Sequence, residues 1–154
     1  MSTASETKPA TDFERTLNGM LYSLLSWQQL ADFWPKIDPA AGWYLYAIGE
    51  PVPQFPASPE QVSTFIQKID SLLHNDHDED YCGIVYANDL NNPSLIKIYD
   101  PHNLGSSCGS SKNPPLPGWI MSRMPPSYLQ PKGIIPGNRK RWWETLMSGS
   151  TSSL

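Results

Sequence analysis

The sequence lacks the short motifs that mark many nucleotide-dependent and metal-dependent enzymes. It contains no P-loop, no dinucleotide-binding glycine fingerprint, no HExxH pair and no CxxC pair. Cysteine is scarce, since Cys82 and Cys108 are the only two, which is too few for a disulfide-built scaffold. We therefore expect no cofactor and no metal site.

Long apolar runs and an excess of positive charge are also missing. No stretch of eighteen apolar residues is present, so we expect no membrane span. The first residues lack a basic start followed by an apolar run, so they do not predict a secretory signal. With 11 Lys and Arg against 15 Asp and Glu, the net charge is −4, which disfavours nucleic acid as a partner. The sequence therefore predicts a cytoplasmic protein.

The residues that are present suit one folded domain. The chain has 154 residues, 39% of them hydrophobic, with six Trp and seven Tyr to build a core. Composition predicts a disordered N-terminus over residues 1–10, a single α+β domain over residues 11–136, and a C-terminal tail with a short helix over residues 137–154.

Two helices are predicted from caps and apolar periodicity. Thr11 and Glu14 fit a capping box, and apolar residues then recur at helical spacing until Pro35, which predicts one helix over residues 11–34. Ser58, with Pro59 at the first helical position, predicts the start of a second helix that extends to about residue 73.

Four strands are predicted, over residues 43–48, 81–87, 95–99 and 119–123, because these runs are rich in aromatic and β-branched residues. The elements do not alternate as in a doubly wound sheet. The expected fold is therefore α+β, with a mainly antiparallel sheet of about four strands, two helices packed on one face, a long Gly/Ser/Pro loop over residues 100–117 and a short C-terminal helix.

The long loop holds a candidate thiol site. Cys108 is flanked by small residues whose amides would stabilise a thiolate, His102 is a candidate base, and Asp100 would orient the imidazole. The alternative is a structured loop in which Asp100 forms an Asx turn and Cys108 fills a small buried space.

The tail holds a candidate binding site. Arg139 and Arg141 stand beside Trp142 and Trp143, and cations next to indoles are typical of binding surfaces. The alternative is that the two indoles fold back onto the domain while the cations stay in water.

Three weaker patterns have simpler explanations. His74 and His77 lie in an acidic run that offers metal ligands but is more typical of a solvated loop. Prolines at SH3-ligand spacing, such as Pro53 and Pro56, are expected by chance in a chain with sixteen Pro. Tyrosines on the predicted sheet would line a small-molecule site only if the face opposite the helices were open.

These observations favour a non-enzymatic accessory or adaptor protein that binds a protein partner. The alternative is a small thiol-dependent enzyme or ligand-binding protein whose site is the loop over residues 100–117. Neither the ligand nor the partner can be specified from the sequence.

Overall fold

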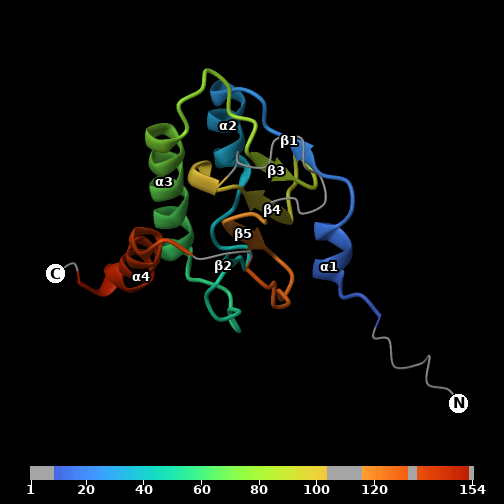
Figure 1. Cartoon of the computed structure of the whole chain (residues 1–154). Coiled ribbons are helices and arrows are strands. Elements are labelled where there is room, and N and C mark those ends of the chain that lie inside the picture. Colours follow the sequence, from blue (N-terminus) through green and yellow to red (C-terminus); the bar gives the residue numbers. More distant parts are fainter. Residues whose placement is uncertain (1–8, 104–115, 132–134, 153–154) are drawn as a thin grey trace, which may run out of the picture.

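A five-stranded antiparallel sheet forms the centre of the computed structural model, which describes residues 9–103, 116–131 and 135–152 (Figure 1). The strand order is β1-β3-β4-β5-β2, and each neighbouring pair is antiparallel. The strands are β1 (Tyr22–Ser23), β2 (Tyr44–Ala47), β3 (Val85–Ala87), β4 (Leu95–Ile98) and β5 (Trp119–Ser122). The α+β class with a mainly antiparallel sheet is confirmed, with one strand more than expected.

The helix α3 (Pro59–Asp76) follows the sequence prediction most closely. Ser58 accepts a hydrogen bond from the amide of Gln61, whose side chain bonds back to the Ser58 amide, so the capping box is closed. Its apolar stripe, which includes Val62, Phe65 and Ile69, is buried. The helix runs about one turn beyond the predicted end.

The prediction of one helix over residues 11–34 is wrong. This segment forms α1 (Asp12–Leu17), strand β1, helix α2 (Trp27–Phe33) and a 3₁₀ turn, η2 (Trp34–Lys36). The Thr11–Glu14 capping box is present at α1, but Ser26 caps a new helix by accepting from the amide of Gln29. Between the two helices the backbone pairs with β3, which replaces helical hydrogen bonds with sheet ones.

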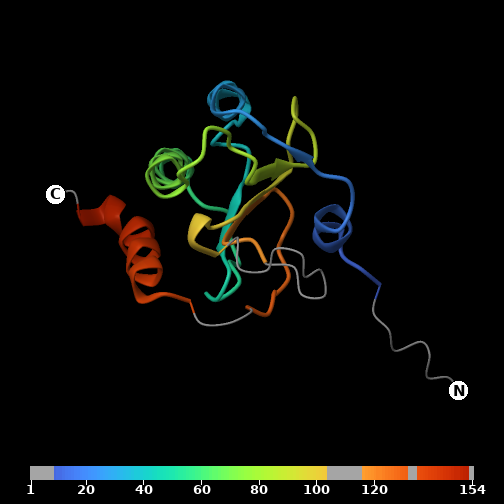
Figure 2. The ribbon, with the colours of Figure 1, turned by 45° about the horizontal axis from the view of Figure 1, so that its top comes forward.

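Both faces of the sheet are covered (Figure 2). Helices α2, α3 and α4 (Gly137–Ser152) pack with one face, whose buried strand residues are Leu45, Ala47, Val85, Ala87, Ile96, Ile98, Trp119 and Met121. Helix α1 covers part of the other face through Phe13, which packs with Tyr46, Leu95 and Ile120. The segment expected to be one helix on one face thus supplies helices to both faces.

The chain between β4 and β5 is described only at its two ends. The 3₁₀ turn η3 (Pro101–Asn103) follows β4, and the chain is described again from Leu116. Most of the predicted long loop, and residues 1–8 of the predicted disordered N-terminus, lie outside the described residues. No helix in the described part of the chain is long and apolar enough to cross a membrane.

Candidate functional site

Asp100, from the predicted thiol site, is occupied by contacts other than the His102 ring. Arg139 donates to both carboxylate oxygens, from Nε to Oδ2 at 2.8 Å and from Nη2 to Oδ1 at 2.9 Å. The contact from His102 to Asp100 is made by the backbone amide, at 2.9 Å, which is the Asx-type turn foreseen as the alternative. Cys108 lies outside the described residues, so a catalytic set that includes it stays a prediction.

The imidazole of His102 faces a different carboxylate. Its Nε2 lies 3.5 Å from Oδ2 of Asp76, at the end of α3, and about half of the side chain is exposed. Asp76 also accepts a hydrogen bond of 2.8 Å from Nη2 of Arg139. Sequence reasoning placed Asp76 only in a polar linker. No local signal pairs it with His102, which lies 26 positions later in the chain, or with Arg139, which lies 63 positions later.

The buried Arg139 guanidinium joins these two carboxylates. Burial alone would lower the pKa of Arg139, but hydrogen bonds to Asp100 and Asp76 and the charges of both carboxylates outweigh it and raise that pKa. The cation therefore stays charged, and it connects α3, the chain after β4 and α4. This cluster acts as an ionic anchor for α4.

The two tail indoles also pack on the domain. The ring of Trp143 lies 6.1 Å from the ring of Phe65, and Trp142 lies 5.5 Å from Trp119 and 6.5 Å from Phe65. Trp143 is buried, Trp142 is half-buried and Arg141 is exposed. Of the four residues predicted to bind a partner, Arg139 and Trp143 are thus enclosed by the fold.

The two histidines of the acidic run are engaged by neighbouring groups. His74 stacks on Trp27 with ring centroids 4.2 Å apart, and Nε2 of His77 lies 2.9 Å from the backbone oxygen of Cys82. Across the described ranges, no three His, Cys, Asp or Glu side chains are grouped so that they could hold a metal ion. His74 thus joins α3 to α2, and His77 fixes the chain that connects α3 to β3.

Trp119 and Tyr46, two aromatic residues of the predicted sheet, lie on opposite faces. Trp119 belongs to the face covered by α2, α3 and α4, whereas Tyr46 lies on the α1 face, where its hydroxyl accepts a 2.8 Å hydrogen bond from the amide of Leu129. Tyr86 and Tyr99 are half-buried, with the ammonium of Lys97 about 5.5 and 5.3 Å from their ring centres. The ammonium of Lys97 thus lies near both rings, which also contact each other edge to face with centroids 5.8 Å apart.

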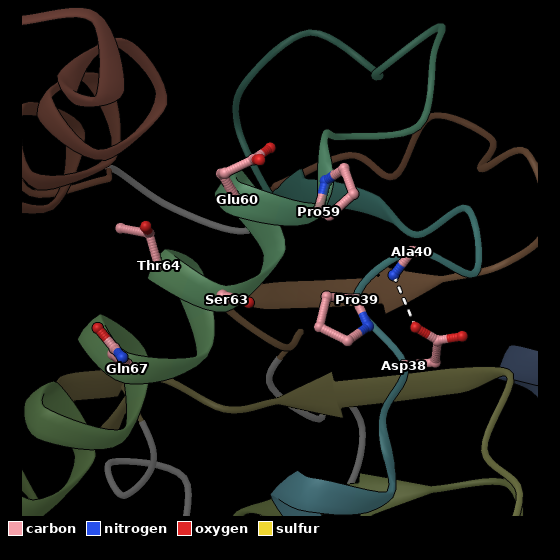
Figure 3. Close-up of a pocket in the computed structure, with 8 residues that line it drawn as sticks. All are labelled: Asp38, Pro39, Ala40, Pro59, Glu60, Ser63, Thr64 and Gln67. Atoms are coloured by element: carbon pink, nitrogen blue, oxygen red, sulfur yellow. Dashed lines mark hydrogen bonds between the residues drawn. The ribbon is translucent and has the colours of Figure 1, made fainter.

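An open pocket of about 440 Å³ lies between the turn at residues 38–40 and the start of α3 (Figure 3). Asp38 and Glu60 give it a negative rim, but Asp38 already accepts a 2.9 Å hydrogen bond from the amide of Ala40. Most of its lining side chains are exposed polar groups and prolines. This pocket does not define a ligand class.

The segment Gly105-Ser-Ser-Cys-Gly109 matches the spacing of the G-x-S-x-G pattern, which marks the nucleophile of some hydrolases. A nucleophile elbow requires a strand directly before the motif and a helix directly after it. Here the chain before it is the 3₁₀ turn η3, which ends at Asn103. The segment itself lies outside the described residues.

Exposed apolar side chains lie instead at and beside strand β1, an outer strand of the sheet in the part of the chain that the structure describes. We call Met20, Tyr22, Leu25 and Tyr81 the β1 edge; their exposed fractions are 73, 46, 63 and 57%. Tyr81 adjoins Leu25 because the next amide, of Cys82, donates to the Leu25 oxygen at 2.9 Å. Sequence reasoning missed this surface because it placed Met20 and Leu25 on the buried face of a helix and Tyr81 in a strand over residues 81–87.

The backbone of the β1 edge is also open. Leu24 donates its amide to the Val85 oxygen at 2.8 Å, in register with the β1–β3 pairs. Because successive residues of a strand direct their peptide groups to opposite sides, the amide and carbonyl of Ser23 face away from β3. Among the described residues, neither these groups nor the buried hydroxyl of Ser23 has a hydrogen-bond partner.

Negative charge flanks this edge. Asp78, Glu79 and Asp80 are exposed and directly precede Tyr81, and the Glu79 oxygen accepts a 3.1 Å hydrogen bond from the Trp27 indole. Neither residues 20–34 nor residues 74–90 contain a Lys or an Arg. The β1 edge is therefore apolar along the strand and acidic at one end.

Comparison with known proteins found no matching family model, no similar curated protein and no similar solved structure. The function proposed below therefore rests on the residues of this chain.

Proposed function

We propose that this protein is a non-enzymatic accessory or adaptor protein that binds a protein partner through the β1 edge. The observation that carries the proposal is the group of exposed apolar side chains along a strand edge that has no partner strand among the described residues. Water-exposed apolar groups that gather in one region are typical of protein contact sites. Tyr22 and Tyr81 add the large, stiff aromatic area that is enriched in interfaces.

The C-terminal tail is the less favourable binding surface of the two. Arg139 and Trp143 are both enclosed, so removing them from the domain to meet a partner would expose a buried ion cluster and an indole. Met20 and Leu25 need no such rearrangement, because they already face water. Binding at the β1 edge therefore has the smaller conformational cost.

We further infer a cytoplasmic location for this complex. Cys82 is a buried thiol with no disulfide partner, which suits a reducing compartment. Fractionation of the source cells would test this location, and recovery outside the cytoplasm would contradict it.

Site-specific photo-cross-linking tests the binding surface. A benzoylphenylalanine placed at Leu25 should form a discrete adduct with a partner protein in the source cells, and the same probe at Phe55 should not. Phe55 is a matched control because it is 79% exposed but lies in the proline-rich connector, away from the sheet edge.

A second variant confirms that the adduct reports specific binding. Adding the double substitution Met20→Ser and Tyr22→Ser to the Leu25 probe should abolish the adduct while the melting temperature stays nearly unchanged. Equal adducts from Leu25 and Phe55, or an adduct that survives the double substitution, would contradict the proposal.

A further inference from the structure

We propose that the β1 edge binds an extended, Lys- or Arg-bearing segment of the partner by adding it to the sheet as a further strand beside β1. This inference rests on the proposed function, and it specifies both the mode of binding and the chemistry of the partner. The open amide and carbonyl of Ser23 supply the backbone hydrogen bonds that strand addition requires.

The open stretch of backbone is short and well defined. On one side of it the amide of Leu25 is already occupied, because the side chain of Gln29 accepts its hydrogen at 2.8 Å. The added strand therefore pairs at Ser23, at the rim of the sheet where β3 is the one described strand beside β1 (Figure 1). Tyr22 and Leu25 flank this point and provide apolar contact area on either side of it.

The segment that forms this edge lacks the lysine and proline that usually protect against strand addition. Natural sheet edges are commonly guarded by lysine, proline or a covering segment. The segment over residues 20–34 has no lysine and no proline, and the exposed Leu25 lies two positions after Ser23. The cation nearest in register is Lys97, which pairs with Tyr86 one strand further in and whose ammonium lies near the rings of Tyr86 and Tyr99.

The negative charge beside the β1 edge determines which kind of added strand is favoured. Asp78, Glu79 and Asp80 bring three exposed carboxylates to the end of the edge. A second copy of this chain would bring three more, and like charges brought together at an interface oppose association. A segment that carries Lys or Arg gains attraction from the same carboxylates, so a basic partner is favoured over self-association.

Synthetic peptides test the mode of binding directly. An eight-residue peptide of alternating valine and lysine should shift the amide resonances of residues 22–25 of the full chain, and the shifts should shrink as salt is added. An alternating valine and glutamate peptide should not bind. The valine and lysine peptide with N-methyl groups on alternate amides should lose binding, because one edge of its backbone can no longer donate.

Ser23→Pro isolates the backbone contribution on the protein side. Because the Ser23 amide faces away from β3, proline removes no internal hydrogen bond, and proline is tolerated on edge strands in this orientation. We expect the valine and lysine peptide to bind this variant about five- to tenfold more weakly. Ser23→Ala keeps the amide and should bind like the unmodified protein.

Distinct results would overturn the inference. Equal affinity for the lysine and glutamate peptides, indifference to N-methylation, or resonance shifts confined to other surfaces would each reject strand addition by a basic segment. If Ser23→Pro does not fold, the N-methylated peptide carries the test alone. A dimer seen by sedimentation whose formation is abolished by Ser23→Pro would show that a second copy is the occupant instead.

The two proposals fail in different ways. If the Leu25 cross-link to a partner persists in Ser23→Pro but disappears with Met20→Ser and Tyr22→Ser, the partner binds through side chains and only strand addition is wrong. If no cross-link forms at Leu25 at all, the proposed function itself is wrong.

Discussion

The guanidinium of Arg139 is paired with the carboxylate of Asp100 through two hydrogen bonds, of 2.8 and 2.9 Å, although 39 positions separate the two residues. A third hydrogen bond, of 2.8 Å, reaches Asp76 at the end of α3. Both partners in the Arg139–Asp100 pair are largely withdrawn from water. The helix predicted in the C-terminal tail, whose docking the sequence left open, is thereby fixed to the domain.

Arg139→Ala should destabilise the protein by about 3 kcal/mol, because it leaves two carboxylates facing each other in a poorly hydrated site. Urea unfolding followed by circular dichroism measures the change. Arg141→Ala is the matched control, since Arg141 is exposed on the same helix, and it should change the unfolding free energy by less than about 0.5 kcal/mol. Equal effects of the two substitutions would contradict the ionic anchor.

Trp143→Ala should lower the free energy of unfolding by about 3 kcal/mol, since it removes a buried indole from its contact with Phe65 and leaves a cavity. Thermal unfolding checks this value. Tyr128→Ala removes an aromatic ring that is 57% exposed and serves as the control. A Trp143→Ala protein as stable as the control would show that α4 does not dock in solution.

Ser58→Ala should cost about 1 kcal/mol, because the amide of Gln61 loses its acceptor at the start of α3. Ser58→Asp should keep most of the stability, since a carboxylate also accepts this hydrogen bond and suits the positive end of the helix. Chemical denaturation of the three proteins compares them. A loss with aspartate as large as with alanine would argue against the capping role.

The Cys82 thiol predicts a loss of stability in alkaline solution. Burial raises its pKa, and the negative charge of Asp70 adds to this, while backbone hydrogen bonds from Ile84, Val85 and Gly83 act in the opposite direction. The folded state therefore holds the proton more tightly than the unfolded state. This contribution to stability is complete below the unfolded pKa of about 8.5 and is lost as the pH rises through the higher folded pKa.

Unfolding free energies measured at pH 8 and pH 10 should thus fall more steeply for the unmodified protein than for Cys82→Ala. The Tyr46→Phe variant is compared in the same measurement. Burial also raises the pKa of Tyr46, but from an ordinary value near 10, so the Tyr46 hydroxyl affects stability at higher pH than the Cys82 thiol does. Identical pH slopes for Cys82→Ala and the unmodified protein would contradict a buried thiol.

Local signals in the sequence predicted the features that are local in the structure. The cap at Ser58 and the apolar stripe of α3 lie within one segment, so composition and spacing were sufficient. The division of residues 11–34 was not predictable in this way, since β1 is set by pairing with β3, more than sixty positions later in the chain. Apolar residues of a helix, a strand and a second helix followed one another closely enough to resemble one helical stripe.

The contacts of the candidate site depended still more on the fold. The sequence placed Asp100 and His102 in one candidate site and Arg139 in another, but only the tertiary structure joins Asp100 to Arg139 and turns the His102 ring toward Asp76. The exposure of Met20 and Leu25 was not predicted, because the mistaken helix over residues 11–34 placed both on its buried face. Whether Cys108 belongs with His102 stays a prediction.

The position of β2 at one end of the sheet has a consequence for synthesis on the ribosome. Its only strand partner in the described chain is β5, which begins about 70 residues later, so at roughly 5–20 residues per second β2 waits several seconds for it. Until Trp119 leaves the exit tunnel, the apolar side of β2 has no neighbouring strand. A nascent chain stalled before that residue should therefore be a substrate for chaperones that hold unfolded polypeptides, and one stalled well beyond it should not.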